Sequence, residues 1–339
     1  MNETSDFSAA GELVCPAGTP AALRTAVDAG ADSVYCGFRN ATNARNFPGL
    51  NFTAEELEAS VAYAHARGAR VLLALNTYPP AGKVGLWRDA ADIGVRAGVD
   101  AFIVADMGVA HYIAETHPGA RLHLSVQAAA SSPEAIRYYC QHFGVRRVVL
   151  PRILTIPEIR EIKREIPCEI ETFVFGNHGL MVEGRCSLTN WLTGQSTNMD
   201  GVCSPASDVT YEREADGSMR SCLAGFTIDA FGPEENAGYP TICKGRYVAP
   251  HRPEGYYAFE EPVSLNLGRL LPELMAAGVH AFKIEGRQRS KSYVRSVVSN
   301  FRRAVDDIRA GAEPNLADLV ALTEGQKETQ GAFKSKKWR

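Results

Sequence analysis

The sequence predicts an α/β fold: a TIM-type (β/α)8 barrel with a roughly 90-residue insertion between its seventh and eighth strands. A helical stretch ending in Gly, then a short β-branched and apolar run, recurs along the chain, as in "AHARGARVLLALN" and "GVRAGVDAFIVAD". Eight such runs occur, the number that closes this barrel. The seventh and eighth runs are about a hundred residues apart, far more than an ordinary loop of a few residues.

The eight runs are expected to be parallel strands. Each apolar run fits a strand buried on both faces, and the Gly before it fits a left-handed helix C-cap. Strands that alternate with helices imply parallel pairing through right-handed crossovers. The strands are expected near Leu13, Val34, Val71, Phe102, Leu122, Val148, Ile170 and Phe282. A doubly wound open sheet is the alternative, but no G-x-G-x-x-G follows any strand.

The chain is expected to divide into five segments. The first is a flexible N-terminal tail, and the third contains "SPASDVTYEREADGSMRSCLAGFTID", which alternates as strands do. The segments are the tail at 1–11, barrel strands one to seven at 12–175, a cysteine-bearing insertion at the barrel mouth at 176–265, the last strand with an amphipathic C-terminal helix at 266–325, and a basic C-terminal tail at 326–339.

Composition and charge restrict the class of function. The chain has 339 residues, 45% hydrophobic and 22% charged, with a net charge of −3, values typical of a soluble globular protein. Both signs of charge are interspersed, so DNA or RNA is not expected as the main partner. No run approaches the roughly 18 apolar residues of a membrane span, and "MNETSDFSAAGE" lacks the regions of a signal peptide. A cytoplasmic protein without a transmembrane segment is expected.

Three of the eight cysteines lie in turn-rich sequence. Cys186, Cys203 and Cys243 occur in "EGRC", "GVCSP" and "TICKGR". In a reducing compartment, cysteines grouped in irregular sequence indicate a metal or cluster site more often than disulfides. An iron–sulfur cluster, a zinc site and a chance grouping all stay open, because no C-x-x-C is present.

Polar residues at the predicted strand ends are candidates for catalysis, because barrel active sites lie there. Alternation in "AFKIEGRQR" puts Lys283, Glu285 and Arg287 on one face. Charges that point into a barrel are costly unless paired or used, so these three are expected either to orient a substrate or oxygen donor or to form a structural ion pair. The other candidates are Cys15, Tyr35, Asn43, Arg45, Asn76, Asp106, Gln127 and Arg152. Among these, the guanidinium of Arg45 suits bidentate binding of a carboxylate.

Several sequence blocks occur together in a fixed order: "ELVCPAG", "FGNHGLMVEGRC", "WLTG", "CSP", "ENAGYPTICKGRY" and "KIEGRQRS". Together they resemble the collagenase-like peptidase family of unclassified catalytic type, U32, and within it most closely the UbiU-type proteins of ubiquinone biosynthesis. The resemblance covers nearly the whole chain, from about Glu12 to the terminal "GAFKSKKWR".

The resemblance implies a role in oxygen-independent ubiquinone biosynthesis. Such proteins act in anaerobic ring hydroxylation of a ubiquinone precursor, as a heterodimer with a homologous UbiV-like partner, and each partner carries a [4Fe–4S] cluster on four cysteines. Other relatives hydroxylate RNA bases. The peptidase label gains no support, because neither G-x-S-x-G nor H-E-x-x-H is present.

The resemblance also assigns the cluster ligands. Cys186, Cys203 and Cys243 match three of the family's four cysteines, but Gly179 stands where the family has the first. Four explanations stay open for this position. His178 could supply a nitrogen, Cys222 could approach from its predicted strand, one iron could lack a protein ligand, or the cluster could be lost, leaving a diverged non-redox barrel subunit. His178 or an open iron is favoured, because the other three cysteines and their turns are intact.

Overall fold

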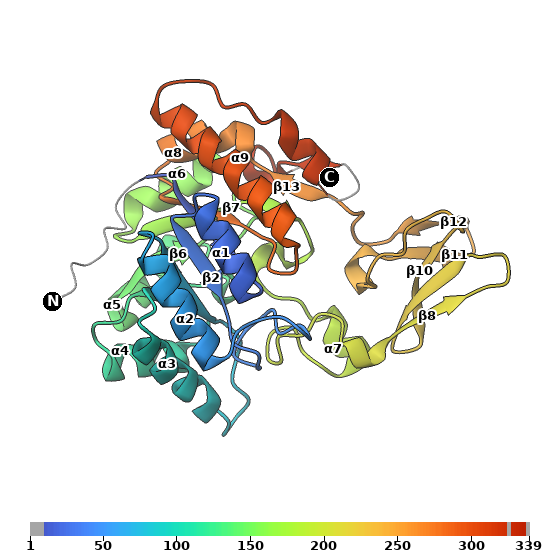
Figure 1. Cartoon of the computed structure of the whole chain (residues 1–339), viewed down its shortest axis with the longest axis horizontal. Helices are drawn as coiled ribbons and strands as arrows, with labels where there is room; N and C mark the ends of the chain where they lie inside the picture. The colour runs from blue at the N-terminus through green and yellow to red at the C-terminus, as the bar shows by residue number, and fades with distance from the viewer. Residues whose placement is uncertain (1–9, 324–326, 337–339) are drawn as a thin grey trace.

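The computed structural model describes residues 10–323 and 327–336. Within these residues, eight parallel strands close into a barrel, because β14 pairs with both β1 and β7 (Figure 1). The barrel strands are β1 (Glu12–Pro16), β2 (Ser33–Cys36), β3 (Arg70–Leu75), β4 (Ala101–Val104), β5 (Leu122–Leu124), β6 (Val145–Val149), β7 (Glu169–Asn177) and β14 (Ala281–Ile284). The predicted fold class is confirmed, and every expected strand position falls inside one of these strands.

Helices between the strands cover the outside of the barrel (Figure 1). They are α1 (Pro20–Asp28), α2 (Ala54–His65), α3 (Gly85–Ala97), α4 (Met107–Thr116), α5 (Pro133–Phe143), α6 (Ile156–Glu165), α8 (Leu271–Ala276) and α9 (Lys291–Arg309). Local sequence sets several of their ends. Thr53 and Thr155 each begin a helix with a reciprocal capping box, and Gly98 and Gly144 end α3 and α5 in left-handed geometry.

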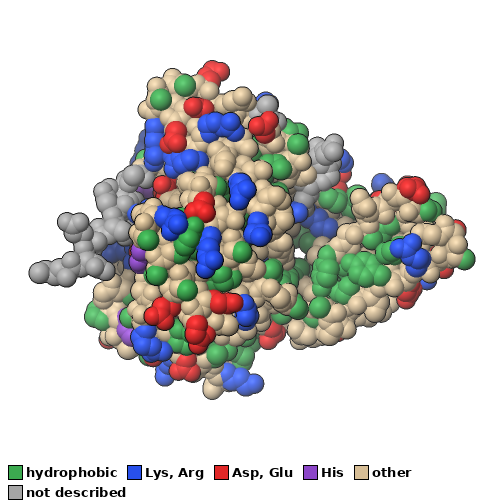
Figure 2. All heavy atoms as spheres, viewed as in Figure 1, with side chains coloured by type: hydrophobic (Ala, Val, Ile, Leu, Met, Phe, Trp, Pro, Cys, Tyr) green, Lys and Arg blue, Asp and Glu red, His purple; other side chains and the backbone are tan. Residues whose placement is uncertain are grey.

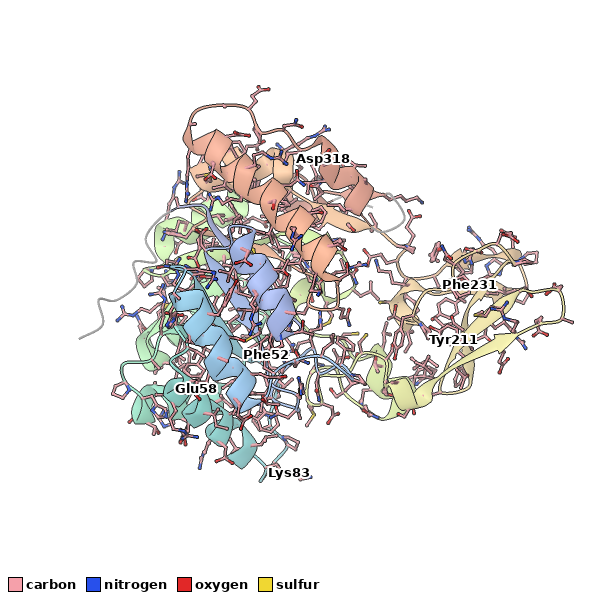
Figure 3. The ribbon with its side chains drawn as sticks, viewed as in Figure 1. Phe52, Glu58, Lys83, Tyr211, Phe231 and Asp318 are labelled. Atoms are coloured by element: carbon pink, nitrogen blue, oxygen red, sulfur yellow. The ribbon has the colours of Figure 1, made fainter. Side chains whose placement is uncertain are left out.

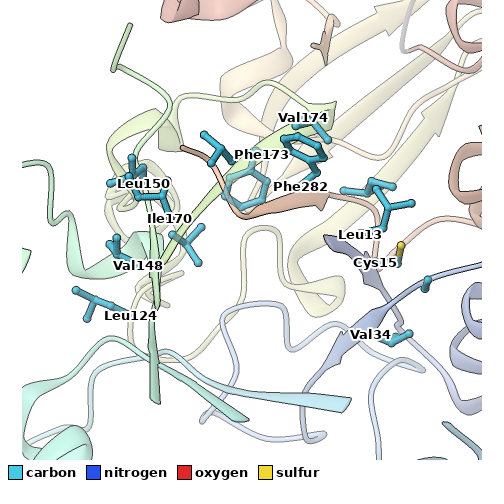
Figure 4. Close-up of a cluster of buried hydrophobic side chains, with 14 of the residues drawn as sticks. Leu13, Cys15, Val34, Leu124, Val148, Leu150, Ile170, Phe173, Val174 and Phe282 are labelled. Carbon is cyan, nitrogen blue, oxygen red and sulfur yellow. The ribbon is translucent and has the colours of Figure 1, made fainter. Parts of the chain in front are cut away.

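The main hydrophobic core lies between the barrel and this ring of helices. Outward-facing strand residues such as Leu13, Val148 and Phe282 are fully buried there (Figure 4). The predicted candidate Cys15 belongs to the same layer, which makes it a packing residue. Alternation along each strand therefore assigns one face to this core and leaves the opposite face for the barrel interior.

The barrel interior is charged near the N-terminal ends of the strands, where Glu12 and Glu169 begin β1 and β7. Arg147 is completely buried and contacts three carboxylates, at 2.6 Å from Glu12, 2.7 Å from Glu169 and 3.3 Å from Glu171. Lys283 completes the group, with its ammonium 2.6 Å from Glu171. A second, small apolar cluster adjoins this charged group. It consists of Val14, Tyr35, Leu72, Ala74, Ala101, Ile103 and Ala281. Lys283 therefore forms a buried ion pair with Glu171 inside the barrel.

The chain between β7 and β14 contains an insertion that projects from the barrel (Figure 1). Its elements are α7 (Leu188–Thr193), an antiparallel sheet of β8 (Val209–Arg213), β9 (Met219–Leu223) and β10 (Phe226–Phe231), and a hairpin of β11 (Arg246–Ala249) and β12 (Arg252–Tyr257). Figure 3 labels Tyr211 and Phe231 within these sheets. The chain returns through β13 (Ser264–Asn266), which pairs antiparallel with the far end of β7.

The C-terminal segment packs onto this return strand. β15 (Glu328–Thr329) pairs parallel with β13, and Ala332 and Phe333 after it are buried. The described part of the predicted basic tail is therefore in contact with the rest of the protein. Residues 1–9 of the predicted N-terminal tail lie outside the described residues. No helix among the described residues combines the length and apolar character that crossing a bilayer requires.

Candidate functional site

The loop that carries Cys186 leaves β7 and lies against the barrel rim. Gly184 has φ +107°, and a Cβ atom there would lie 1.9 Å from the Val126 carbonyl oxygen. Only glycine permits this approach and this backbone conformation. The next residue, Arg185, donates from Nε to the Gln127 carbonyl oxygen at 3.0 Å. The backbone immediately before Cys186 is thus fixed on the loop that follows β5.

Asn198 holds Cys186 from the other side. Its amide Nδ2 donates to the Cys186 carbonyl oxygen at 2.8 Å, and its Oδ1 accepts from the Cys186 N–H at 3.3 Å. The Asn198 carbonyl oxygen in turn accepts from the Tyr78 N–H at 2.9 Å, next to the C-terminal end of β3. One asparagine therefore links the cysteine backbone to the rim of the barrel.

Cys203 is positioned by a second close approach between the insertion and the rim. A Cβ atom on Gly201 would lie 2.0 Å from the Asn43 carbonyl oxygen, and the Asn46 N–H donates to the Gly201 carbonyl oxygen at 3.0 Å. The Cys203 carbonyl oxygen accepts from the Thr189 hydroxyl at 2.5 Å. Because Thr189 is in α7, the segment of Cys203 is held between α7 and the loop after β2.

Cys243 lies in a short 3-10 turn, Ile242–Lys244, that packs against α7. Its carbonyl oxygen accepts from the Glu260 N–H at 3.2 Å. Three segments separated in sequence therefore bring Cys186, Cys203 and Cys243 around α7.

Burial and nearby charges shift the pKa of two of the three thiols. Burial raises the pKa of Cys243 to about 12, and Cys203 and Cys186 act in the same direction. Burial also raises the pKa of Cys203; Arg45 opposes this shift and Cys186 adds to it. Such thiols stay protonated at neutral pH until a cation compensates the thiolate charge. This donor set fits a thiolate-bound metal centre, which releases the protons on binding.

The separation of the three cysteines bears on the kind of metal centre that they would hold. Among the described residues, no three Cys, His, Asp or Glu side chains gather closely enough for one metal ion. A single tetrahedral zinc holds each sulfur within about 2.3 Å of itself. A cluster of several irons distributes its cysteines over different irons and so separates them further.

Gly179, at the predicted position of the missing cysteine, has open space around it. A Cβ atom on Gly179 would meet only the Asn177 Oδ1, at 3.7 Å, so a side chain fits there. The neighbouring His178 is fully buried, and its ring lies beside Gly331, whose added Cβ would be 3.0 Å from Cε1. Cys222 is buried in β9, with its sulfur 3.8 Å from the Thr227 hydroxyl. The fourth ligand therefore stays a prediction.

The remaining predicted residues divide between structure and the barrel mouth. Asp106 accepts from the Val109 N–H and caps α4, while Asn76 accepts from the Ala44 N–H and holds the loop after β2. The side chains that converge at the mouth are Tyr35, Asn43, Arg45, Arg152, Glu285 and Arg287. All six are candidates predicted from the sequence, but their convergence could not be predicted, because they come from three strands that are far apart in the chain, β2, β6 and β14.

Comparison with known proteins identifies relatives of the whole chain. The sequence model of "Peptidase family U32" matches residues 18–337. The chain is 32% identical over 331 residues to tRNA hydroxylation protein P of Escherichia coli, covering 93% of this chain and 72% of that protein. It is 30% identical over 306 residues to an uncharacterized protease of Methanocaldococcus jannaschii, covering 89% and 66%.

The name of a third relative contains a different RNA, 23S rRNA. The chain is 29% identical over 320 residues to the 23S rRNA 5-hydroxycytidine C2501 synthase of Escherichia coli, covering 94% of this chain and 42% of that protein. The chain thus spans about two thirds of the archaeal relative and less than half of the rRNA enzyme. The predicted family resemblance is confirmed by the match over residues 18–337.

Proposed function

From the premise that this chain belongs to peptidase family U32, we propose that it is an iron–sulfur protein of oxygen-independent hydroxylation. Its substrate is an aromatic ubiquinone precursor, and it works as a heterodimer with a homologous UbiV-like barrel. The observation that carries the proposal is the grouping of three half-buried cysteines around α7, beside a barrel mouth lined with arginine and tyrosine.

In this proposal Cys186, Cys203 and Cys243 hold a [4Fe–4S] cluster. When bound, such a cluster supplies electron transfer or an iron that binds a reactant. The protein's own part is to orient the substrate, and Glu285 and Arg287 at the mouth suit that role. Lys283 is reassigned from substrate contact to positioning, because its ammonium is engaged by Glu171 inside the barrel.

A small aromatic substrate is favoured over RNA by charge. The net charge is −3, and Figure 2 shows cationic and anionic side chains interspersed over the barrel face. RNA-binding surfaces instead concentrate Lys and Arg on one face. Hydroxylation of an RNA base is the second candidate, and the names of two relatives favour it. A non-redox subunit without a complete cluster is the third, and Gly179 favours it.

The first test is the iron and acid-labile sulfide content of protein purified without oxygen. About four irons and four sulfides per chain are expected, as a [4Fe–4S] cluster requires. Cys186→Ser should lose both, whereas Cys140→Ser, on α5, should keep them. Gly179→Cys has room for its side chain and should make the cluster more resistant to air. Absence of iron from every anaerobic preparation would favour the non-redox subunit.

The second test identifies the substrate. Deleting the gene should abolish ubiquinone in anaerobic cultures and leave aerobic ubiquinone unchanged. Digested tRNA and rRNA from the same cells should be analysed by mass spectrometry for hydroxylated nucleosides. A missing hydroxylated nucleoside with an unchanged quinone profile would transfer the function to RNA.

A further inference from the structure

Three arginines converge on the barrel mouth from different strand ends. Arg45 follows β2, Arg152 follows β6 and Arg287 follows β14. Arg152 and Arg287 are only 6% and 8% exposed. Burial lowers the pKa of both to about 10, and the charge of Arg45 acts on each in the same direction. Met181 contacts both Arg45 and Arg152, and Asn43 contacts both Arg45 and Arg287, so the three side chains are neighbours.

The hydrogen-bond partners of Arg152 are neutral. Arg152 donates to the carbonyl oxygens of Asn177 and Met181 at 2.9 Å and 3.4 Å, and its buried Nε has no partner among the described residues. The guanidinium carbon lies 5.0 Å from the centre of the Phe173 ring. This side chain therefore has an N–H donor that the described protein leaves available.

The other two arginines are held in the same way. Arg287 donates to the Asn43 Oδ1 at 2.6 Å and lies 5.4 Å from the centre of the Tyr35 ring. Arg45 donates to the Ala44 carbonyl oxygen at 2.9 Å and has the Met181 sulfur 3.9 Å from both terminal nitrogens. An amide, a carbonyl and a thioether orient these guanidinium groups without neutralising them.

The contrast with Arg147 indicates what is missing. Arg147, lower in the same barrel, contacts three carboxylates. None of the ion pairs found in the described residues includes Arg45, Arg152 or Arg287. The carboxylates of Glu285 and Glu260 raise the pKa of Arg152, but neither is in contact with it. Buried cations are normally paired, so two buried arginines beside the half-buried Arg45, all without a contacting anion, indicate a site for one.

We propose that Arg45, Arg152 and Arg287 form an anion subsite that binds a carboxylate or phosphate group of a small substrate. The inference deepens the proposed function and rests on it. Guanidinium groups suit both anions because their parallel N–H donors match paired oxygens. The rings of Tyr35 and Phe173 beside the arginines favour an anion attached to an aromatic body.

The subsite borders the cysteine site. Asn43 accepts from Arg287 at 2.6 Å, and its carbonyl oxygen lies against Gly201, two residues before Cys203. A molecule whose anionic group is held by the arginines therefore extends toward the three thiols. The arginines would fix the orientation in which the substrate presents its ring.

The test measures anion binding to the full chain purified without oxygen. Thermal unfolding is followed at constant ionic strength with benzoate, inorganic phosphate or AMP replacing chloride. A ligand that binds only the folded state raises the melting temperature in a saturable way. Benzoate should do so, with a dissociation constant at least tenfold larger for Arg152→Met and Arg287→Met. Arg160→Met, an exposed arginine on α6, is the matched control and should behave as wild type.

Each outcome has a defined meaning. Arg152→Met without ligand should fold and melt no lower than wild type, because it removes a buried charge that lacks a contacting anion. Tighter binding of phosphate or AMP than of benzoate supports the subsite and assigns it to a phosphate. The proposal is overturned if wild type, Arg152→Met and Arg287→Met bind each probe with equal affinity, or if no probe binds in a saturable way. Cys186→Ser should lose iron yet keep benzoate binding, which separates failure of the subsite from failure of the proposed function.

Discussion

Replacing Arg147 by Met is expected to destabilise the barrel strongly. Arg147 is 0% exposed and contacts Glu12, Glu169 and Glu171 at 2.6, 2.7 and 3.3 Å. Removing one partner of a buried ion pair typically costs about 3–5 kcal/mol, because a buried charge is left uncompensated. Methionine fills similar volume, so little of the loss would come from a cavity.

The surrounding charges place the expected loss at the lower end of that range. Without Arg147, each carboxylate keeps one cation: Glu171 keeps Lys283 at 2.6 Å, Glu169 keeps Arg121 at 2.6 Å, and Glu12 keeps Arg70 at 3.4 Å. We therefore expect a loss of about 3 kcal/mol in the free energy of unfolding.

Equilibrium unfolding in urea, followed by circular dichroism, measures the loss. With a slope of about 3 kcal/mol per molar urea, the midpoint should fall by about 1 M. The matched control is Arg164→Met, whose ion pair with Glu161 is exposed on α6, and it should change stability by less than about 0.5 kcal/mol. Equal midpoints for the two variants would refute the view that the charged layer supports the barrel.

Three further predictions concern protonation and backbone geometry. Burial holds the pKa of His123 well below its usual 6.5, so at low pH the unfolded chain binds a proton that the folded chain does not. The free energy of unfolding should therefore fall as the pH decreases below about 6.5, by up to about 1.4 kcal/mol per pH unit. His123→Gln should remove that component of the pH profile. Burial raises the pKa of Cys243 to about 12, so in iron-free protein its alkylation by iodoacetamide at pH 8 should be much slower than that of free cysteine. Peptide mass spectrometry measures the rate, and an equal rate would contradict the burial. Gly184→Ala should destabilise the cysteine loop by about 2 kcal/mol or more and lower the iron content, whereas Gly179→Ala, which has open space, should do neither in parallel melting and iron assays.

The barrel could be predicted from sequence because its signal is local and repeated. Each strand near a predicted position, such as Val71 or Phe282, follows a helix that ends in a few turn residues. The charged interior could not be predicted in the same way. In "VRRVV" Arg146 is exposed and Arg147 is buried, and only the register of β6 against its neighbours decides which one points inward.

The candidate site was predictable as a set of residues but not as an arrangement. Cys186, Cys203 and Cys243 are marked by their turns, and Arg45 and Arg152 by their places after strands. Their meeting depends on close backbone approaches at Gly184 and Gly201, for which the sequence shows only a glycine among 30. Long-range contacts of this kind leave no periodic pattern in the sequence, so they cannot be predicted from one sequence taken alone.

The closure of the barrel by β14 sets an order of events during synthesis. Glu12 on β1 pairs with Ala281 on β14, so the first strand lacks one neighbour until most of the chain has been translated. At about 5–20 residues per second, that interval is on the order of ten seconds or longer. All three turn-bound cysteines leave the ribosome within it, before the finished barrel can bury them. Iron delivered to the nascent chain would therefore meet thiols that are still accessible and acidic enough to bind it.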